Sequence, residues 1–99
     1  MLAKSLLRLQ HERRDIGFLG ARVTEEESSR NPSWALRIES PANAEEFRDH
    51  LTDGSSMSLV MVTRDGERLS GEAYVATISD GMDTATVVVL TGAGPLRHT

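Results

Sequence analysis

The chain has no cysteine, which excludes disulfide bonds, thiolate catalysis and cysteine-ligated zinc. Aromatic residues are scarce, because Phe18, Trp34, Phe47 and Tyr74 are the only four among 99 residues. The hydrophobic core must therefore consist mainly of aliphatic side chains and methionine. The longest purely apolar run, 87–90, is far shorter than the roughly 20 residues of a membrane helix. The sequence predicts no membrane span.

Basic residues are in the minority, with 11 Lys and Arg against 15 Asp and Glu, and the net charge is −4. A partner held through its phosphates needs clustered Lys and Arg, so we predict no nucleic-acid partner. Arg8, Arg13 and Arg14 interrupt the apolar residues at the N-terminus, and no small-residue cleavage site follows, so we expect that residues 1–14 are not a secretory signal. The expected location is the cytoplasm.

Motifs that carry catalysis or cofactor binding are also missing. His11, His50 and His98 lie in separate segments, and none has a second His or Cys at ligand spacing. No Gly-x-Ser-x-Gly nucleophile pattern is present. The segment 87–94 is similar to the strand and glycine turn of sirtuin deacylases, but Pro95 follows and too few residues remain for the helix that would hold a pyrophosphate. We predict a protein that is not an enzyme and that has no cofactor and no metal.

Turn signals divide the second half of the chain. They are Asp53-Gly54, Asp65-Gly66 and Asp80-Gly81. Glycine reaches positive φ without strain, and aspartate bonds its own backbone, so each pair favours a turn. The β-rich runs 57–63, 68–79 and 84–91 lie between and after these pairs, as is typical of an antiparallel meander. Residues 64–67 are expected to form a two-residue turn of the primed type.

Two helices and two strands are expected in the first half. Leu2, Leu6 and Leu9 recur at i, i+4 and i+7 and predict an amphipathic helix over residues 1–14. So short a helix is marginal alone in water, so it either covers an open end of its own domain or docks on an acidic or membrane partner. Alternating residues predict strands over 21–24 and 33–39.

The second predicted helix begins near Pro41 and ends at Asp53-Gly54. Asn43 and Glu46 have the spacing of a capping box. A buried stripe is expected along this helix, formed by Ala44, Phe47 and Leu51.

These patterns predict one α+β domain over residues 1–99. Its body is a small antiparallel five-stranded sheet or partly open barrel, with one inserted helix and an N-terminal helix, in the order α-β-β-α-β-β-β. The helix covers 1–14, the β-rich body 15–96 and a tail 97–99. The alternative architecture is an OB-like or SH3-like barrel.

The segments 71–79 (GEAYVATIS) and 83–96 (DTATVVVLTGAGPL) resemble the C-terminal strands of phage tail-tube proteins. Those proteins also end in a strand, a turn of small residues and a short apolar tail. The resemblance covers about a quarter of the chain. It implies a non-enzymatic, ring-forming subunit, located in a virion if the chain is phage-derived.

The last predicted strand, 84–91, is uncharged and β-prone, and we expect it at a sheet edge that is either covered or paired with another chain. Together with the apolar face of the N-terminal helix it gives a candidate interaction surface. Its residues are Leu2, Leu6, Leu9, Thr84, Thr86, Val88 and Leu90. The sequence thus predicts a structural or protein-interaction module that self-associates or binds a protein partner. The alternative is a barrel that binds a ligand or nucleic acid.

Overall fold

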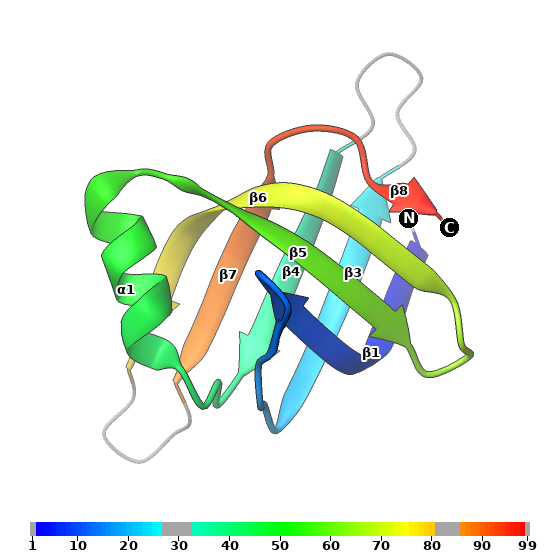
Figure 1. The fold of residues 1–99 in the computed structure, drawn as a ribbon, viewed down its shortest axis with the longest axis horizontal. Coiled ribbons are helices and arrows are strands. Elements are labelled where there is room, and N and C mark those ends of the chain that lie inside the picture. The colour runs from blue at the N-terminus through cyan, green and yellow to red at the C-terminus, as the bar shows by residue number, and fades with distance from the viewer. Residues whose placement is uncertain (1, 27–32, 81–85, 99) are drawn as a thin grey trace.

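The structure is a computed structural model that describes residues 2–26, 33–80 and 86–98. Its strands are β1 (Leu2–His11), β2 (Arg14–Asp15), β3 (Gly20–Glu26), β4 (Ser33–Glu39), β5 (Ser56–Thr63), β6 (Arg68–Ser79), β7 (Val87–Gly92) and β8 (Arg97–His98), and its helix is α1 (Ala44–Asp53). Six strands form an antiparallel barrel in the order β1-β3-β4-β7-β6-β5 (Figure 1). Pairing of β1 with β5 closes it. The short strands β2 and β8 lie outside the ring and pair with β1 and β6.

Strand β1 closes the barrel because it pairs with two strands in succession. Its first residues pair with β3, from Leu2 opposite Glu25 onward, and its later residues pair with β5. The register shifts between Leu6 and Arg8, where the strand passes from one partner to the other.

The predicted N-terminal helix over residues 1–14 is wrong, since β1, a turn and the start of β2 occupy the described part of that segment. The register shift in β1 lets Leu6 and Leu9 both face the core, at 2% and 0% exposure, while Leu7 is 66% exposed. A β-bulge thus produces an i, i+3 spacing that also fits a helix face. A short helix has little stability of its own, whereas β1 gains strand pairing and core burial.

The predicted five-stranded, partly open barrel with two helices is therefore corrected to a closed six-stranded barrel with one helix among the described residues. The expected sheet edge at the last strand is also wrong, because β7 pairs with β4 on one side and β6 on the other. The strands expected at 33–39 and 68–79 are confirmed as β4 and β6. Residues 81–85, which include part of the last predicted turn and strand, lie outside the described residues.

Helix α1 covers one end of the barrel and packs against β6 (Figure 1). It ends as predicted, with Gly54 at φ 73° and its N–H donated to the carbonyl of His50. The expected capping box does not form, because the Asn43 side chain makes no capping bond. Phe47 is fully buried, but Leu51 is 41% exposed, so the predicted buried stripe is only partly correct. Among the described residues, no helix combines the length and the apolar character needed to cross a membrane.

The β5–β6 connection differs from the predicted two-residue primed turn. Within residues 64–67, Gly66 has positive φ, at 91°, and Asp65 does not. Thr63 and Glu67 pair across three residues, since the Thr63 N–H donates to the Glu67 carbonyl at 2.9 Å and the Glu67 N–H donates to Thr63 Oγ1 at 3.0 Å. This is a three-residue hairpin loop with glycine in the left-handed position.

Candidate functional site

A groove of about 460 Å³ crosses the outer face of β5 and β6. Its floor includes Ser58 and Val60 from β5 and Ser70 and Glu72 from β6. The turn between β1 and β2 lines the β5 side, and the segment Gly94–Arg97 lines the β6 side.

Arginines surround the groove because strand register brings them to one outer face. Arg8 and Arg68 both lie opposite Val62, on β1 and β6 respectively. Arg97 of β8 lies opposite Ser70 of β6. Residues directly opposite one another on neighbouring strands point to the same face. These side chains therefore project over the same surface of the sheet.

The charges of the groove are only partly neutralised. Arg13 and Arg97 form no ion pair with any described residue, whereas Arg8 pairs with Asp15 at 3.5 Å. Two carboxylates, Glu12 and Glu72, also line the groove. Within the lining, Arg13 and Arg97 balance Glu12 and Glu72, and the rim residues Arg8 and Arg68 with Asp15 bring the formal charge to +1 in a chain of net charge −4.

The turn beside the groove has an unfavourable backbone. Glu12 and Arg13 have φ values of 51° and 68°, in the left-handed region that residues other than glycine rarely adopt. Each such residue costs roughly 1–2 kcal/mol. Pairing of His11 with Arg14 and of Gln10 with Asp15 holds the turn in place. No residue type in the sequence indicates this turn, because neither position is a glycine or asparagine.

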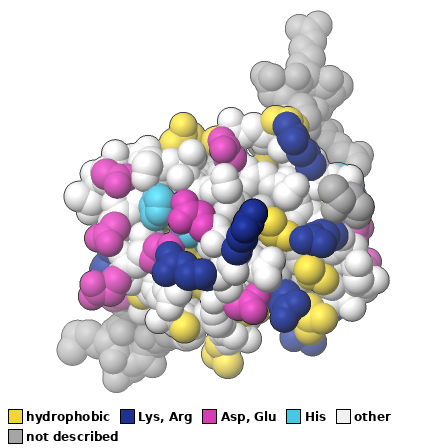
Figure 2. Space-filling view, in the orientation of Figure 1, with side chains coloured by type: hydrophobic (Ala, Val, Ile, Leu, Met, Phe, Trp, Pro, Cys, Tyr) yellow, Lys and Arg dark blue, Asp and Glu magenta, His cyan; other side chains and the backbone are white. Residues whose placement is uncertain are grey.

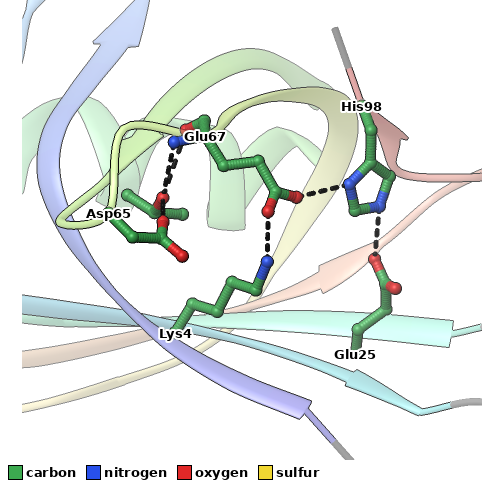
Figure 3. Close-up of polar contacts among 6 residues, drawn as sticks. Lys4, Glu25, Asp65, Glu67 and His98 are labelled. Atoms are coloured by element: carbon green, nitrogen blue, oxygen red, sulfur yellow. Dashed lines mark hydrogen bonds and ion pairs between the residues drawn. The ribbon is translucent and has the colours of Figure 1, made fainter.

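A polar network anchors β8, which lines the other side of the groove (Figure 3). Nδ1 of His98 lies 2.6 Å from Glu67 Oε1, and Nε2 lies 3.2 Å from Glu25 Oε1. Lys4 donates to the second carboxylate oxygen of Glu67. Both ring nitrogens of His98 face carboxylates, so the doubly protonated ring fits this position best. The network joins β8 to β1, β3 and the β5–β6 turn.

These contacts shift the titration of the groups involved. The pKa of His98 is raised above its ordinary value of 6.5, first by the hydrogen bond to Glu67 and also by Glu25. The pKa of Glu67 is lowered by its hydrogen bonds to Lys4 and His98. In the adjacent turn, the Thr63 hydroxyl donates to Asp65 and lowers the pKa of that carboxyl group.

A second cluster combines two histidines that are remote in the sequence. His11 of β1 is 3% exposed, and its Nδ1 lies 2.7 Å from Oε1 of Glu46 on α1. The ring of His50, one helical turn further along α1, is perpendicular to the His11 ring with centroids 5.4 Å apart. Potential ligand atoms of the three side chains lie within 4.8 Å of one another.

Sequence reasoning missed this cluster because His11 was assigned to a helix of its own. The one local signal was the i, i+4 spacing of Glu46 and His50, which places both side chains on the same helix face. The third member comes from a strand 35 residues before Glu46.

The predicted interaction residues do not form a common surface. Four of them belong to the core, with at most 2% exposure: Leu6, Leu9, Val88 and Leu90. Leu2 lies in β1 opposite Glu25. Thr86 is half-buried and donates a hydrogen bond of 3.0 Å to Asp80, and Thr84 lies outside the described residues. The groove was not anticipated.

No protein-family model, curated protein or solved structure matches this chain. The groove, the polar network and the histidine cluster are the features of the described residues that bear on function.

Proposed function

We propose that this chain is a non-enzymatic structural module that associates with itself, with the groove of one copy binding the acidic face of α1 of the next copy. That acidic face consists of Glu45, Asp49 and Asp53, which recur at i, i+4 and i+8 and are all exposed. The observation that supports the proposal is the presence of two complementary charged surfaces on one molecule.

The two surfaces are separated in space. Figure 2 shows acidic side chains gathered at the left, over α1 in the orientation of Figure 1, and Lys and Arg side chains across the middle and right. Glu45 and Asp49 form no ion pair with any described residue, and neither do Arg13 and Arg97. Unpaired charges of opposite sign on different surfaces favour contact between copies.

The dimensions of the two surfaces agree. Residues at i and i+8 of a helix lie about 12 Å apart along its axis. The strands β1 and β8, which border the groove, are separated by three strand spacings, or about 14 Å. A helix laid across the groove would bring its acidic residues within reach of both Arg13 and Arg97.

The expected affinity is low and salt-dependent. An exposed ion pair contributes about 0–1 kcal/mol, and Val60 and Val62 add limited apolar contact because they are only half-buried in the free chain. Ionic strength screens such contacts. Association should therefore be strongest at low salt.

The contact joins two different surfaces, so it is heterologous and can repeat from copy to copy. Repetition of such a contact gives a closed ring or an open filament. This agrees with what the resemblance of residues 71–96 to the C-terminal strands of tail-tube proteins implies, and it would place a phage-derived chain in a virion. The exposed last strand expected from the sequence is not part of the proposal.

Charge reversal with complementation tests the proposal. Arg13→Glu/Arg97→Glu and Glu45→Lys/Asp49→Lys should each be monomeric in light scattering at concentrations where the native chain associates. In an equimolar mixture, the native acidic face of one variant meets the native groove of the other, and the reversed groove and reversed face are complementary as well, so association should be restored. Arg64→Glu, which reverses an exposed arginine outside the groove lining, is the matched control and should associate like the native chain.

Two outcomes would contradict self-association through the groove. One is a native chain that stays monomeric at every concentration and salt tested. The other is a mixture of the two variants that remains monomeric although each variant is folded.

A barrel that binds a ligand or nucleic acid remains the second candidate, since Arg13 and Arg97 could also hold phosphates. It is disfavoured because Glu12 and Glu72 line the same groove and none of its lining residues is aromatic, so bases have nothing to stack on. Fluorescence anisotropy with short DNA and RNA separates the two candidates. A Kd tighter than about 1 μM at physiological salt would favour the nucleic-acid candidate.

A further inference from the structure

We propose that His11, Glu46 and His50 form a Zn²⁺-binding site that links strand β1 to helix α1. Two imidazoles and one carboxylate are a ligand set of zinc sites that keep one coordination position open for water. The proposal does not depend on self-association, because none of the three residues lines the groove or belongs to the acidic face of α1.

The geometry needs small adjustments to hold the ion. Zinc bonds of about 2.0–2.2 Å in a tetrahedron place the ligand atoms about 3.3–3.5 Å apart. In the structure, His11 Nδ1 and Glu46 Oε1 are 2.7 Å apart, and no pair of ligand atoms in the cluster exceeds 4.8 Å. Zinc would replace the proton between His11 and Glu46, these two ligand atoms would separate by less than about 1 Å, and His50 would move inward by up to about 1.5 Å.

A neighbouring hydroxyl already orients one ligand. His50 Nδ1 lies 2.7 Å from Ser55 Oγ, just beyond the end of α1. A His50 ring whose Nδ1–H donates to Ser55 presents its Nε2 lone pair as the ligand atom. Such outer contacts fix the tautomer and direction of ligating histidines in metal sites.

One cation already competes for the carboxylate. Arg14 Nη2 lies 3.2 Å from the same Glu46 oxygen that contacts His11. The Arg14 side chain is 67% exposed, so it can turn into solvent when an ion binds. Zinc and the Arg14 guanidinium would therefore be alternative partners of Glu46.

Hydrogen bonding of His11 alone does not account for the cluster. A buried imidazole needs a partner for its N–H, and Glu46 provides one. His50 forms no hydrogen bond to either residue, yet its ring lies edge-on against His11. A second imidazole beside a buried His–Glu pair is what three-ligand zinc binding requires.

Zinc titration of the untagged full chain tests the site. Calorimetry should show saturable binding of one Zn²⁺ per chain, reversed by EDTA. At a free Zn²⁺ concentration a hundredfold above Kd, the Tm should rise by about 10 °C. His50→Ala removes a half-buried ligand, and both the saturable heat and the Tm rise should be lost.

Three further variants make the result specific. Glu46→Gln should lose zinc binding, while His98→Ala, which removes the histidine outside the cluster, should keep it. Arg14→Ala removes the competing guanidinium and should bind zinc at least as tightly as the native chain. The proposal is overturned if the native chain shows no saturable heat, if folded His50→Ala binds zinc as well as the native chain, or if folded Arg14→Ala loses binding.

Discussion

The indole Nε1–H of Trp34 donates a hydrogen bond of 2.9 Å to the carbonyl oxygen of Gly94, 60 residues further along the chain. The indole is 3% exposed and lies against two glycines on neighbouring strands, Gly71 of β6 and Gly92 of β7. It therefore fixes the segment after β7 to the barrel. That segment continues into β8, so Trp34 also helps to position one side of the groove.

Adding a methyl group at Gly92 should destabilise the fold. A Cβ there would lie 2.3 Å from Trp34 Nε1, and a rigid ring cannot move aside within a packed core. We expect Gly92→Ala to lower the free energy of unfolding by about 1–3 kcal/mol. Gly94→Ala is the control, because a Cβ at Gly94 has no neighbour within 4 Å. Urea denaturation of both variants tests this, and equal stabilities would show that the indole is not confined as described.

Strand β1 provides a second matched pair. Leu9 is fully buried and Leu7 is 66% exposed, although they are two positions apart. Leu9→Ala should cost about 2–5 kcal/mol through lost burial and the cavity left behind. Leu7→Ala should change stability by less than about 0.5 kcal/mol. If thermal or urea denaturation finds the two variants equally stable, β1 does not pack as the core strand that closes the barrel.

The sequence predicted the elements whose signals are local. The strand over 33–39 follows from alternation around Leu36, and the end of α1 follows from Gly54, which takes the left-handed conformation expected of a glycine after a helix. In β6, Leu69, Ala73 and Val75 alternate into the core. Gly71 lies on the same face, where it accommodates the Trp34 ring.

The features that were predicted wrongly or missed depend on contacts between segments that are distant in the sequence. The spacing of Leu6 and Leu9 fits a helix and a bulged strand equally well. The strand forms because Leu6 pairs with Thr63 of β5, which is distant in the sequence, and this pairing closes the barrel. The groove and the histidine cluster were missed for the same reason. Strand order brings Arg13 and Arg97 to the same groove, and the position of α1 on the barrel brings His50 to His11, and sequence spacing records neither arrangement.

Relief of backbone strain at the β1–β2 turn should stabilise the fold. Asn-Gly is the preferred pair when both central residues have positive φ, so Glu12→Asn/Arg13→Gly should raise the free energy of unfolding by about 1–2 kcal/mol. Gly66→Ala is the opposite test, since Gly66 has φ 91° and the substitution should destabilise. Urea denaturation at low protein concentration avoids a contribution from association. A double variant no more stable than the native chain would mean that Glu12 and Arg13 do not adopt these φ values in solution.

The anchoring of β8 should depend on pH through His98. Its pKa in the folded chain is raised above the ordinary 6.5, mainly by the hydrogen bond to Glu67. A raised pKa means that the folded chain holds this proton more tightly than the unfolded chain does. The stabilising contribution is therefore complete below about pH 6.5 and is lost as the pH rises through the raised value. The effect should be modest, because the His98 side chain is 49% exposed.

Comparison with His98→Gln isolates this contribution. The native chain should have the higher urea midpoint near pH 6, and the difference should shrink as the pH rises toward about 8, the range over which histidine titrates. NMR titration of the His98 ring should give a pKa above 6.5 in the native chain and a lower one in Glu67→Gln. His50→Gln removes a histidine outside the network and should leave the His98 titration unchanged. A His98 pKa at or below 6.5 in the folded native chain would show that Glu67 and Glu25 do not hold the charged ring, and the anchoring of β8 would then have to depend on its backbone pairing with Leu69 and Ser70.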